Sequence, residues 1–285
     1  MMNENLSKIK NTYLLIFFLS LTLVSLKWII SFSLYTENID LRIINDTSDY
    51  YYYPIIKSFS ELKLNPSYLI GDFNLKNISF PYLGLFINSL FLKIFDSYSF
   101  ILLEFICSFI FLVLIYSIFS ELKYSKVFSI FVSVLFFILP VLLKYTANLI
   151  DINLLNMLSV NFEAFYSLRF PRPAISNLFL FSFIFLNIKF YYSEKKFLNY
   201  LFYLSILMGF SINIFFYHFF IESFMLLFTF ILKFKKDFFK IIFNNLKYFI
   251  LYLVILIIFI IIFQSQIYFS ETDYVQRLGV FEVST

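Results

Sequence analysis

Long apolar segments, each close to the length that a helix needs to cross a lipid bilayer, recur along this chain. A membrane-spanning helix requires about 20 mostly apolar residues because the hydrocarbon core of a bilayer is about 30 Å thick. Segments of this kind occupy residues 12–34, 98–119, 127–145, 174–192, 197–215, 217–234 and 246–267. We therefore expect an all-α, polytopic helical membrane protein with about seven transmembrane helices, forming one transmembrane domain over residues 1–285.

The composition agrees with a membrane protein and excludes several kinds of site. Hydrophobic residues make up 61% of the chain, charged residues 14%, and the mean hydropathy is +0.85, far above ordinary soluble domains. Cys107 is the only cysteine and His218 the only histidine, so an internal disulfide and a Cys- or His-rich metal site are excluded. The lysines behind the net charge of +4 lie beside apolar segments rather than along one basic face, so we expect no nucleic-acid partner.

Lysines in the short links indicate which side of the membrane each link occupies. The first apolar segment follows Lys8 and Lys10 and is too long for a cleaved signal peptide, so we expect an uncleaved signal anchor with a cytoplasmic N-terminus. Counted from there, every link on the cytoplasmic side carries lysine, as the positive-inside rule requires. These lysines are Lys123, Lys126, Lys195, Lys196, Lys233, Lys235, Lys236 and Lys240. We expect a multi-pass protein of the plasma (inner) membrane, whose acidic segments 35–97, 146–173 and the tail from about 268 face outward.

Residues 81–95 are apolar but too short to span a bilayer. They carry Asn88, Ser89 and Lys93 at helical spacing on one side, which is typical of a helix lying flat in the membrane interface. If this segment crossed the membrane, the positive-inside rule would fail for every later link. We therefore place it on the outer surface, within the first outer loop.

The first outer loop contains the candidates for catalysis. Asp46 and Asp49 are three residues apart and would share one face of a helical turn, and Tyr53 ends the run of tyrosines that follows. A carboxylate beside the membrane can act as a general base on an acceptor hydroxyl or amine, or can hold a divalent cation. The same residues also suit a helix cap followed by an interfacial tyrosine belt, and the sequence leaves both interpretations open.

The second outer loop ends in two arginines that flank a proline. The guanidinium groups of Arg169 and Arg172 match phosphate oxygens two at a time, so a lipid-linked phosphate is a natural ligand. An equally good alternative is that they contact ordinary lipid headgroups.

Four ionisable residues fall in the outer halves of predicted spans: Lys27, Glu104, His218 and Glu222. Charges inside a bilayer are costly and usually face a cavity or a partner. A polar pocket that opens outward would explain all four. Lys27 and His218 could instead extend their polar ends to the membrane surface.

In its order of parts the chain resembles the N-terminal half of the GT-C superfamily of integral membrane glycosyltransferases, which includes the aminoarabinose and protein mannosyl transferases. A signal-anchor span is followed by an outer loop with an acidic motif, Asp46 to Asp49, and by an aromatic, proline-containing interfacial segment that starts at Phe80. Asp151 comes just after the third span, and the tail, at Tyr274–Arg277, resembles the outer segment after the seventh span of such enzymes.

The resemblance implies a donor sugar carried on polyprenyl phosphate and an acceptor that is a lipid, a glycan or a protein. It implies that Asp49 or Asp46 is the catalytic base or metal ligand and that Arg169 and Arg172 bind the lipid phosphate. The expected pocket also includes Asp151, His218, Glu104, Glu222 and Tyr53. Many relatives carry a lysine between the fifth and sixth spans, where this chain has Asn213, Tyr217 and His218, and relatives usually continue for several more spans. The chain could therefore be a fragment, a partial module or a non-catalytic relative.

Two other functions stay open. A transporter or flippase for a lipid-linked substrate would also need polar residues in its spans, although repeated halves and broken helices are not evident. A non-catalytic assembly subunit would use its polar loops to bind a second membrane protein.

Overall fold

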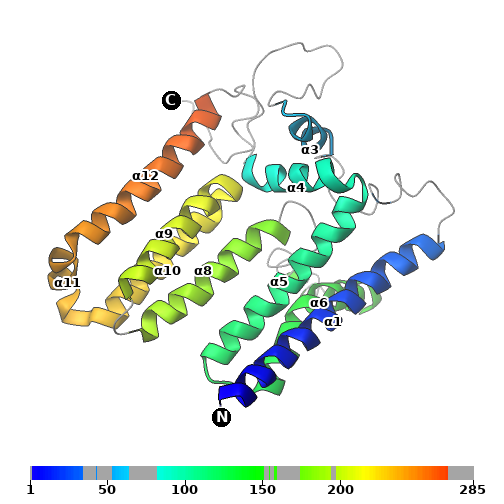
Figure 1. Cartoon of the computed structure of the whole chain (residues 1–285), viewed down its shortest axis with the longest axis horizontal. Helices are drawn as coiled ribbons and strands as arrows, with labels where there is room; N and C mark the ends of the chain where they lie inside the picture. Colours follow the sequence, from blue (N-terminus) through cyan, green and yellow to red (C-terminus); the bar gives the residue numbers. More distant parts are fainter. Residues whose placement is uncertain are drawn as a thin grey trace. The chain divides into compact units, whose positions relative to one another are not determined.

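The computed structural model describes residues 2–34, 43, 53–63, 82–150, 154, 157–158, 174–193 and 197–268. Every regular element in these ranges is helical, which confirms the predicted all-α class (Figure 1). The chain divides into two compact units, which we describe separately. The first comprises residues 1–50 and 94–178, and the second comprises residues 51–93 and 179–285.

The first unit is built around α5 (Tyr98–Glu121), which packs against both α1 (Met2–Leu34) and α6 (Lys126–Ile150). Apart from the adjacent Phe111 and Leu112, the buried apolar residues of α5 follow one another at a spacing of three or four, as expected for a helix with one buried face. They are Phe100, Leu103, Cys107, Phe111, Leu112, Ile115 and Ile118.

A tight turn joins α5 to α6. Lys123 adopts a left-handed conformation with φ 66°. Its N–H donates to Ser120 O at 3.0 Å, and the N–H of Tyr124 donates to Phe119 O at 3.1 Å. The rings of Phe119 and Tyr124 pack with centroids 5.6 Å apart. These two bonds and the apolar contact form a Schellman motif, which satisfies the carbonyls of Phe119 and Ser120 at the end of α5, although lysine occupies the position that glycine usually takes.

The second unit contains α3 (Tyr53–Ser60), most of α4 (Tyr82–Phe95) and α8 (Ala174–Tyr192), and all of the later helices. These are α9 (Phe197–Ile214), α10 (Phe216–Phe234), η2 (Lys235–Asp237), α11 (Phe238–Asn244) and α12 (Leu246–Tyr268). The helix α9 packs against both α10 and α12. Their core includes Phe190 and Phe230, whose ring centroids are 4.8 Å apart, together with Leu204 and Met208 of α9.

Two local contacts hold the helices of the second unit close together. Gly209 lets α12 approach α9, because an added Cβ would lie 2.1 Å from Cδ2 of Phe259. Lys233 of α10 donates from Nζ to the carbonyl oxygens of Phe190 and Ser193 at the C-terminus of α8. The last carbonyls of a helix have no partner within it, so a lysine here satisfies them and matches the negative end of the helix dipole.

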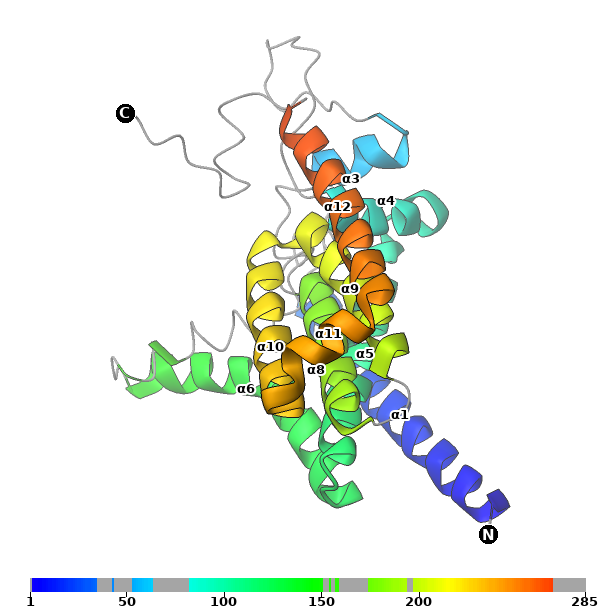
Figure 2. The same ribbon diagram turned by 90° about the vertical axis from the view of Figure 1, so that its left-hand side faces the viewer.

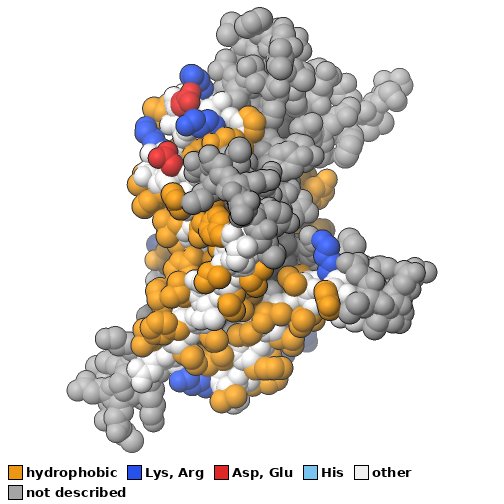
Figure 3. Space-filling model, turned by 90° about the vertical axis from the view of Figure 1, so that its right-hand side faces the viewer, with side chains coloured by type: hydrophobic (Ala, Val, Ile, Leu, Met, Phe, Trp, Pro, Cys, Tyr) orange, Lys and Arg blue, Asp and Glu red, His pale blue; other side chains and the backbone are white. Residues whose placement is uncertain are grey.

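Six described helices are long and apolar enough to cross a membrane. They are Asn11–Ser33, Tyr98–Glu121, Lys126–Thr146, Ala174–Tyr192, Phe216–Asn244 and Leu246–Gln266. The remaining expected span, 197–215, corresponds to α9, which is apolar but shorter. Hydrophobic side chains dominate the described part of the surface in Figure 3. Such extensive apolar exposure suits contact with lipid rather than water, and it agrees with a multi-pass membrane protein.

The helix α4 begins at Tyr82 and ends at Phe95, close to the expected 81–95, and it runs across the direction of α9 and α12 (Figures 1 and 2). The sequence predicts that its three polar residues share one side of an interfacial helix, but they are not exposed together. Lys93 is exposed, whereas Asn88 and Ser89 are only 2% and 1% exposed. Asn88 Nδ2 donates to Gly84 O at 3.0 Å and Ser89 Oγ to Phe86 O at 2.8 Å. These bonds to the helix's own carbonyls lower the free-energy cost of burying the two side chains.

Candidate functional site

In the first unit, Glu104 is buried and both of its carboxylate oxygens accept hydrogen bonds. Lys27 Nζ lies 2.7 Å from Oε1, and Trp28 Nε1 donates to Oε2 at 2.8 Å. The Lys27 ammonium also lies 4.8 Å from the centre of the Trp28 ring. A carboxylate with two donors from α1 joins that helix firmly to α5. Trp28, the only tryptophan, is a member of this group that the sequence analysis did not identify, although it adjoins Lys27.

In the second unit, a buried carboxylate lies near the turn from α9 to α10. The backbone of Phe215 is extended and interrupts the helical conformation between α9 and α10. The two helices can therefore pack against each other. Ser211 Oγ donates to Glu222 Oε1 at 2.7 Å, and Glu222 is 0% exposed. Its other oxygen, Oε2, has no hydrogen-bond partner among the residues that the structure describes. A buried polar atom without a partner costs free energy, so this oxygen is an exception among the described polar groups of the unit.

His218 precedes Glu222 by one helical turn on the buried face of α10. That face continues with Leu226 and Phe230, so it changes from polar to apolar along the helix. The imidazole packs edge-on against the ring of Phe215, with centroids 4.8 Å apart. The polar half of this face is therefore next to the α9–α10 turn, at the end of the unit that the lysine pattern predicts to face outward. We call it the predicted outer end.

Asn213 forms a second polar contact at the predicted outer end, toward α12 instead of α10. Its Nδ2 donates to Phe259 O at 3.3 Å and to Gly209 O at 3.2 Å, and Gln266 Nε2 donates to Asn213 Oδ1 at 3.1 Å. Residues 211 and 213 lie about 200° apart around a helix, so α9 presents one polar side chain to each neighbour. Sequence reasoning missed Ser211 and Gln266, although both are polar residues near the end of an apolar span.

A cavity of about 360 Å³ opens beside this amide pair, between α3, α4 and the ends of α9 and α12. This volume falls in the range of small-molecule sites. Aromatic rings from all four helices line it, among them Phe59, Phe86, Phe210 and Phe259. Asn213 and Gln266 add amide groups to a wall that is otherwise mainly apolar. A site of this kind suits a ligand with a long apolar part and a polar end.

The structure brings only some of the predicted site residues together. Glu104 belongs to the first unit, and His218 and Glu222 lie together in the second. Tyr53 is half-buried at the first residue of α3. The catalytic candidates Asp49 and Asp46, and the predicted binding residues Asp151, Arg169 and Arg172, lie outside the described residues.

The described part of the chain contains no group of three or more His, Cys, Asp or Glu side chains that could hold a metal ion. Asp49 and Asp46, which the sequence offers as alternative ligands of a divalent cation, lie outside that part. No protein-family model, curated protein or solved structure shows significant similarity to this chain.

Proposed function

We propose that this membrane protein binds a sugar linked to polyprenyl phosphate at its predicted outer end and transfers the sugar to a lipid, glycan or protein acceptor. The observation that carries the proposal is the aromatic cavity of about 360 Å³ beside the Asn213–Gln266 amide pair. A polyprenyl chain is a branched apolar hydrocarbon, and its phosphate and sugar are polar. An apolar cavity with amides in its wall matches both parts of such a ligand.

The amide groups support this proposal through their fixed positions. The Asn213 amide is bonded to Gln266, to Gly209 and to the backbone of Phe259, so its orientation is set before a ligand arrives. Preorganised polar groups bind with less loss of conformational entropy than mobile ones.

The chemistry would be carried by the loop residues. Asp49 or Asp46 would remove the proton from the acceptor hydroxyl as its oxygen attacks the anomeric carbon of the sugar. The bond from that carbon to the phosphate oxygen would break, and the polyprenyl phosphate would leave with the bonding electrons. Arg169 and Arg172 would stabilise the negative charge that builds up on this phosphate.

A direct test uses membranes that contain the protein and a labelled polyprenyl-phosphate sugar. If a carboxylate is the general base, Asp49→Asn or Asp46→Asn lowers turnover by roughly 100-fold or more. Asp237→Asn is a matched control, because Asp237 is exposed in η2 and belongs to no predicted site. Unchanged turnover in both loop variants would refute the assignment.

A second candidate is transport of the same lipid-linked substrate without covalent chemistry. Buried Glu222 favours it, since intramembrane carboxylates often mark substrate or ion pathways. Sealed vesicles would separate the two functions: movement of labelled lipid between leaflets with no transferred sugar supports transport, and a transferred sugar supports the enzyme.

A further inference from the structure

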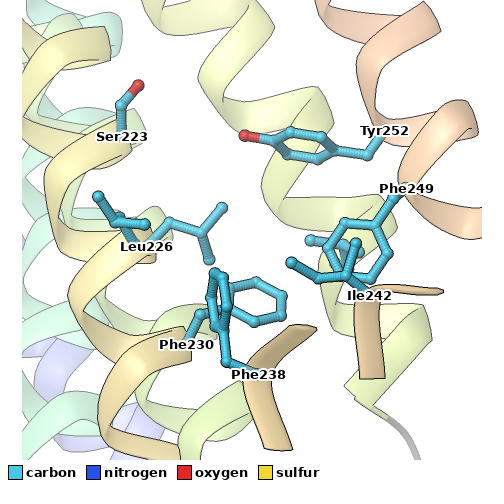
Figure 4. A pocket seen from close by; sticks show the side chains of 9 residues that line it. Ser223, Leu226, Phe230, Phe238, Ile242, Phe249 and Tyr252 are labelled. Carbon is cyan, nitrogen blue, oxygen red and sulfur yellow. The ribbon is translucent and has the colours of Figure 1, made fainter. Parts of the chain in front are cut away.

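At the opposite end of the second unit, a second cavity lies between α10, α11 and α12. Its volume is about 190 Å³, and Leu226, Phe230, Phe238, Ile242 and Phe249 supply most of its wall (Figure 4). An apolar cavity of about 150 Å³ is known to be large enough to bind benzene. This space is therefore sufficient for part of a hydrocarbon chain.

The two hydroxyl groups in the cavity wall are already engaged. Ser223 Oγ donates to Phe219 O at 2.7 Å, and Tyr252 Oη donates to Met208 Sδ at 3.4 Å. A sugar or another polar ligand would find little to bond with here. The wall thus favours an apolar occupant, such as the acyl chain of a lipid.

The short helix α11 presents different residue types around its axis. Phe238 and Ile242 line the cavity. Phe239 and Phe243, one position further along in each case, are 69% and 71% exposed. Lys240 is exposed on another side. Apolar and basic faces on one short helix are typical of a helix at a membrane interface.

Basic residues gather along the connection from α10 to α12. Lys235, Lys236, Lys240 and Lys247 are all exposed, and Asp237 is the one acidic residue between them. Lys233, which precedes them, is bonded to the end of α8. A group of cations next to an apolar cavity is complementary to an anionic phospholipid, whose headgroup is negative and whose chains are apolar.

We propose that an anionic phospholipid binds here, with its headgroup against Lys235, Lys236 and Lys240 and part of one acyl chain in the 190 Å³ cavity. This site is separate from the one at the predicted outer end and does not depend on the proposed transferase activity. On the lysine pattern of the sequence, the lipid would belong to the cytoplasmic leaflet.

The test uses the whole purified protein in neutral detergent, with phosphatidylglycerol or phosphatidylcholine added and bound lipid measured by native mass spectrometry. We expect phosphatidylglycerol to bind more tightly. A lysine near a lipid surface contributes about fivefold in affinity, so the triple variant Lys235→Gln/Lys236→Gln/Lys240→Gln should weaken phosphatidylglycerol binding by about a hundredfold. Equal binding of the two lipids by the parent protein would overturn the proposal.

Two further variants distinguish charge from the cavity. Lys123→Gln/Lys126→Gln removes two exposed lysines from the first unit and should leave binding unchanged. Ile242→Trp fills the cavity and should weaken binding even though every lysine remains. Because Ile242→Trp could disturb folding, the triple lysine variant provides an independent test, since it alters only exposed residues. Unchanged binding in the triple lysine variant would refute the headgroup contact. Inorganic phosphate lacks the acyl chain and should compete much more weakly than free phosphatidylglycerol, and equal competition by the two would overturn the acyl-chain contact.

Discussion

Ser211 Oγ and Glu222 Oε1 lie 2.7 Å apart across the α9–α10 turn, and this hydrogen bond is the one that the buried Glu222 carboxylate makes with the described residues. Its other oxygen, Oε2, is buried and has no partner among the described residues. Together with Asn213 and Gln266, the carboxylate places buried polar groups near the neighbouring ends of α9, α10 and α12.

Two substitutions of Glu222 should separate the contribution of its hydrogen bond to stability from that of its charge. Glu222→Gln keeps an oxygen that can accept from Ser211, so we expect unfolding in detergent to change little. Glu222→Ala leaves the Ser211 hydroxyl without this partner and opens a gap, which should lower the free energy of unfolding by about 1–3 kcal/mol. Thermal unfolding followed by circular dichroism measures both. An equal loss in the two variants would mean that the carboxylate's charge, rather than its hydrogen bond, stabilises the fold.

Glu104 should be important for holding α1 against α5. Glu104→Ala leaves the Trp28 indole N–H and the Lys27 ammonium without their acceptor, and we expect a loss of about 1–3 kcal/mol. Lys27→Met should cost less, because the Lys27 side chain is 35% exposed and water already weakens the ion pair. Trp28 is the only tryptophan, so its fluorescence reports directly on this group. A red shift in Glu104→Ala but not in Glu104→Gln is expected, and identical spectra would contradict the described hydrogen bond.

Lys123 offers a stabilising substitution. Its left-handed backbone is costly for a residue with a Cβ, so Lys123→Gly should raise the free energy of unfolding by up to about 1 kcal/mol. The matched control is Lys126→Gly at the first residue of α6, where added backbone freedom should destabilise the helix. If both variants were destabilised alike, the turn would not have the described conformation.

Gly209 should not tolerate a larger side chain. A Cβ in Gly209→Ala would lie 2.1 Å from Cδ2 and 2.5 Å from Cγ of Phe259, so either α12 or the ring must move. We expect a loss of about 1–3 kcal/mol. Phe259→Leu in the same chain should restore part of it, and this rescue is the decisive measurement, because a general helix effect of alanine would not depend on residue 259. Since Phe259 also lines the 360 Å³ cavity, Gly209→Ala should alter binding of a lipid-linked substrate there.

The helices could be predicted from the chain because the signal for them is local. Apolar length and lysine-bearing links are properties of consecutive residues, so the predicted 98–119 and 246–267 fall within α5 (Tyr98–Glu121) and α12 (Leu246–Tyr268). The helix predicted at 81–95 is found at Tyr82–Phe95 for the same reason. The sequence also indicated that Glu104, His218 and Glu222 were unusual, because ionisable residues are rare in apolar spans.

Tertiary structure decided which partners these residues have and which way each helix faces. Glu104 meets Lys27 and Trp28 from more than 70 positions away, and Gln266 reaches Asn213 across 53 positions. The rotation of α4 about its axis, which buries Asn88 and Ser89, depends on packing rather than on its composition. The two cavities likewise exist only where several helices fail to fill the space between them. Hydrophobicity acts residue by residue and therefore shows in the sequence, whereas contacts and cavities arise from side chains that the chain brings together only when it folds.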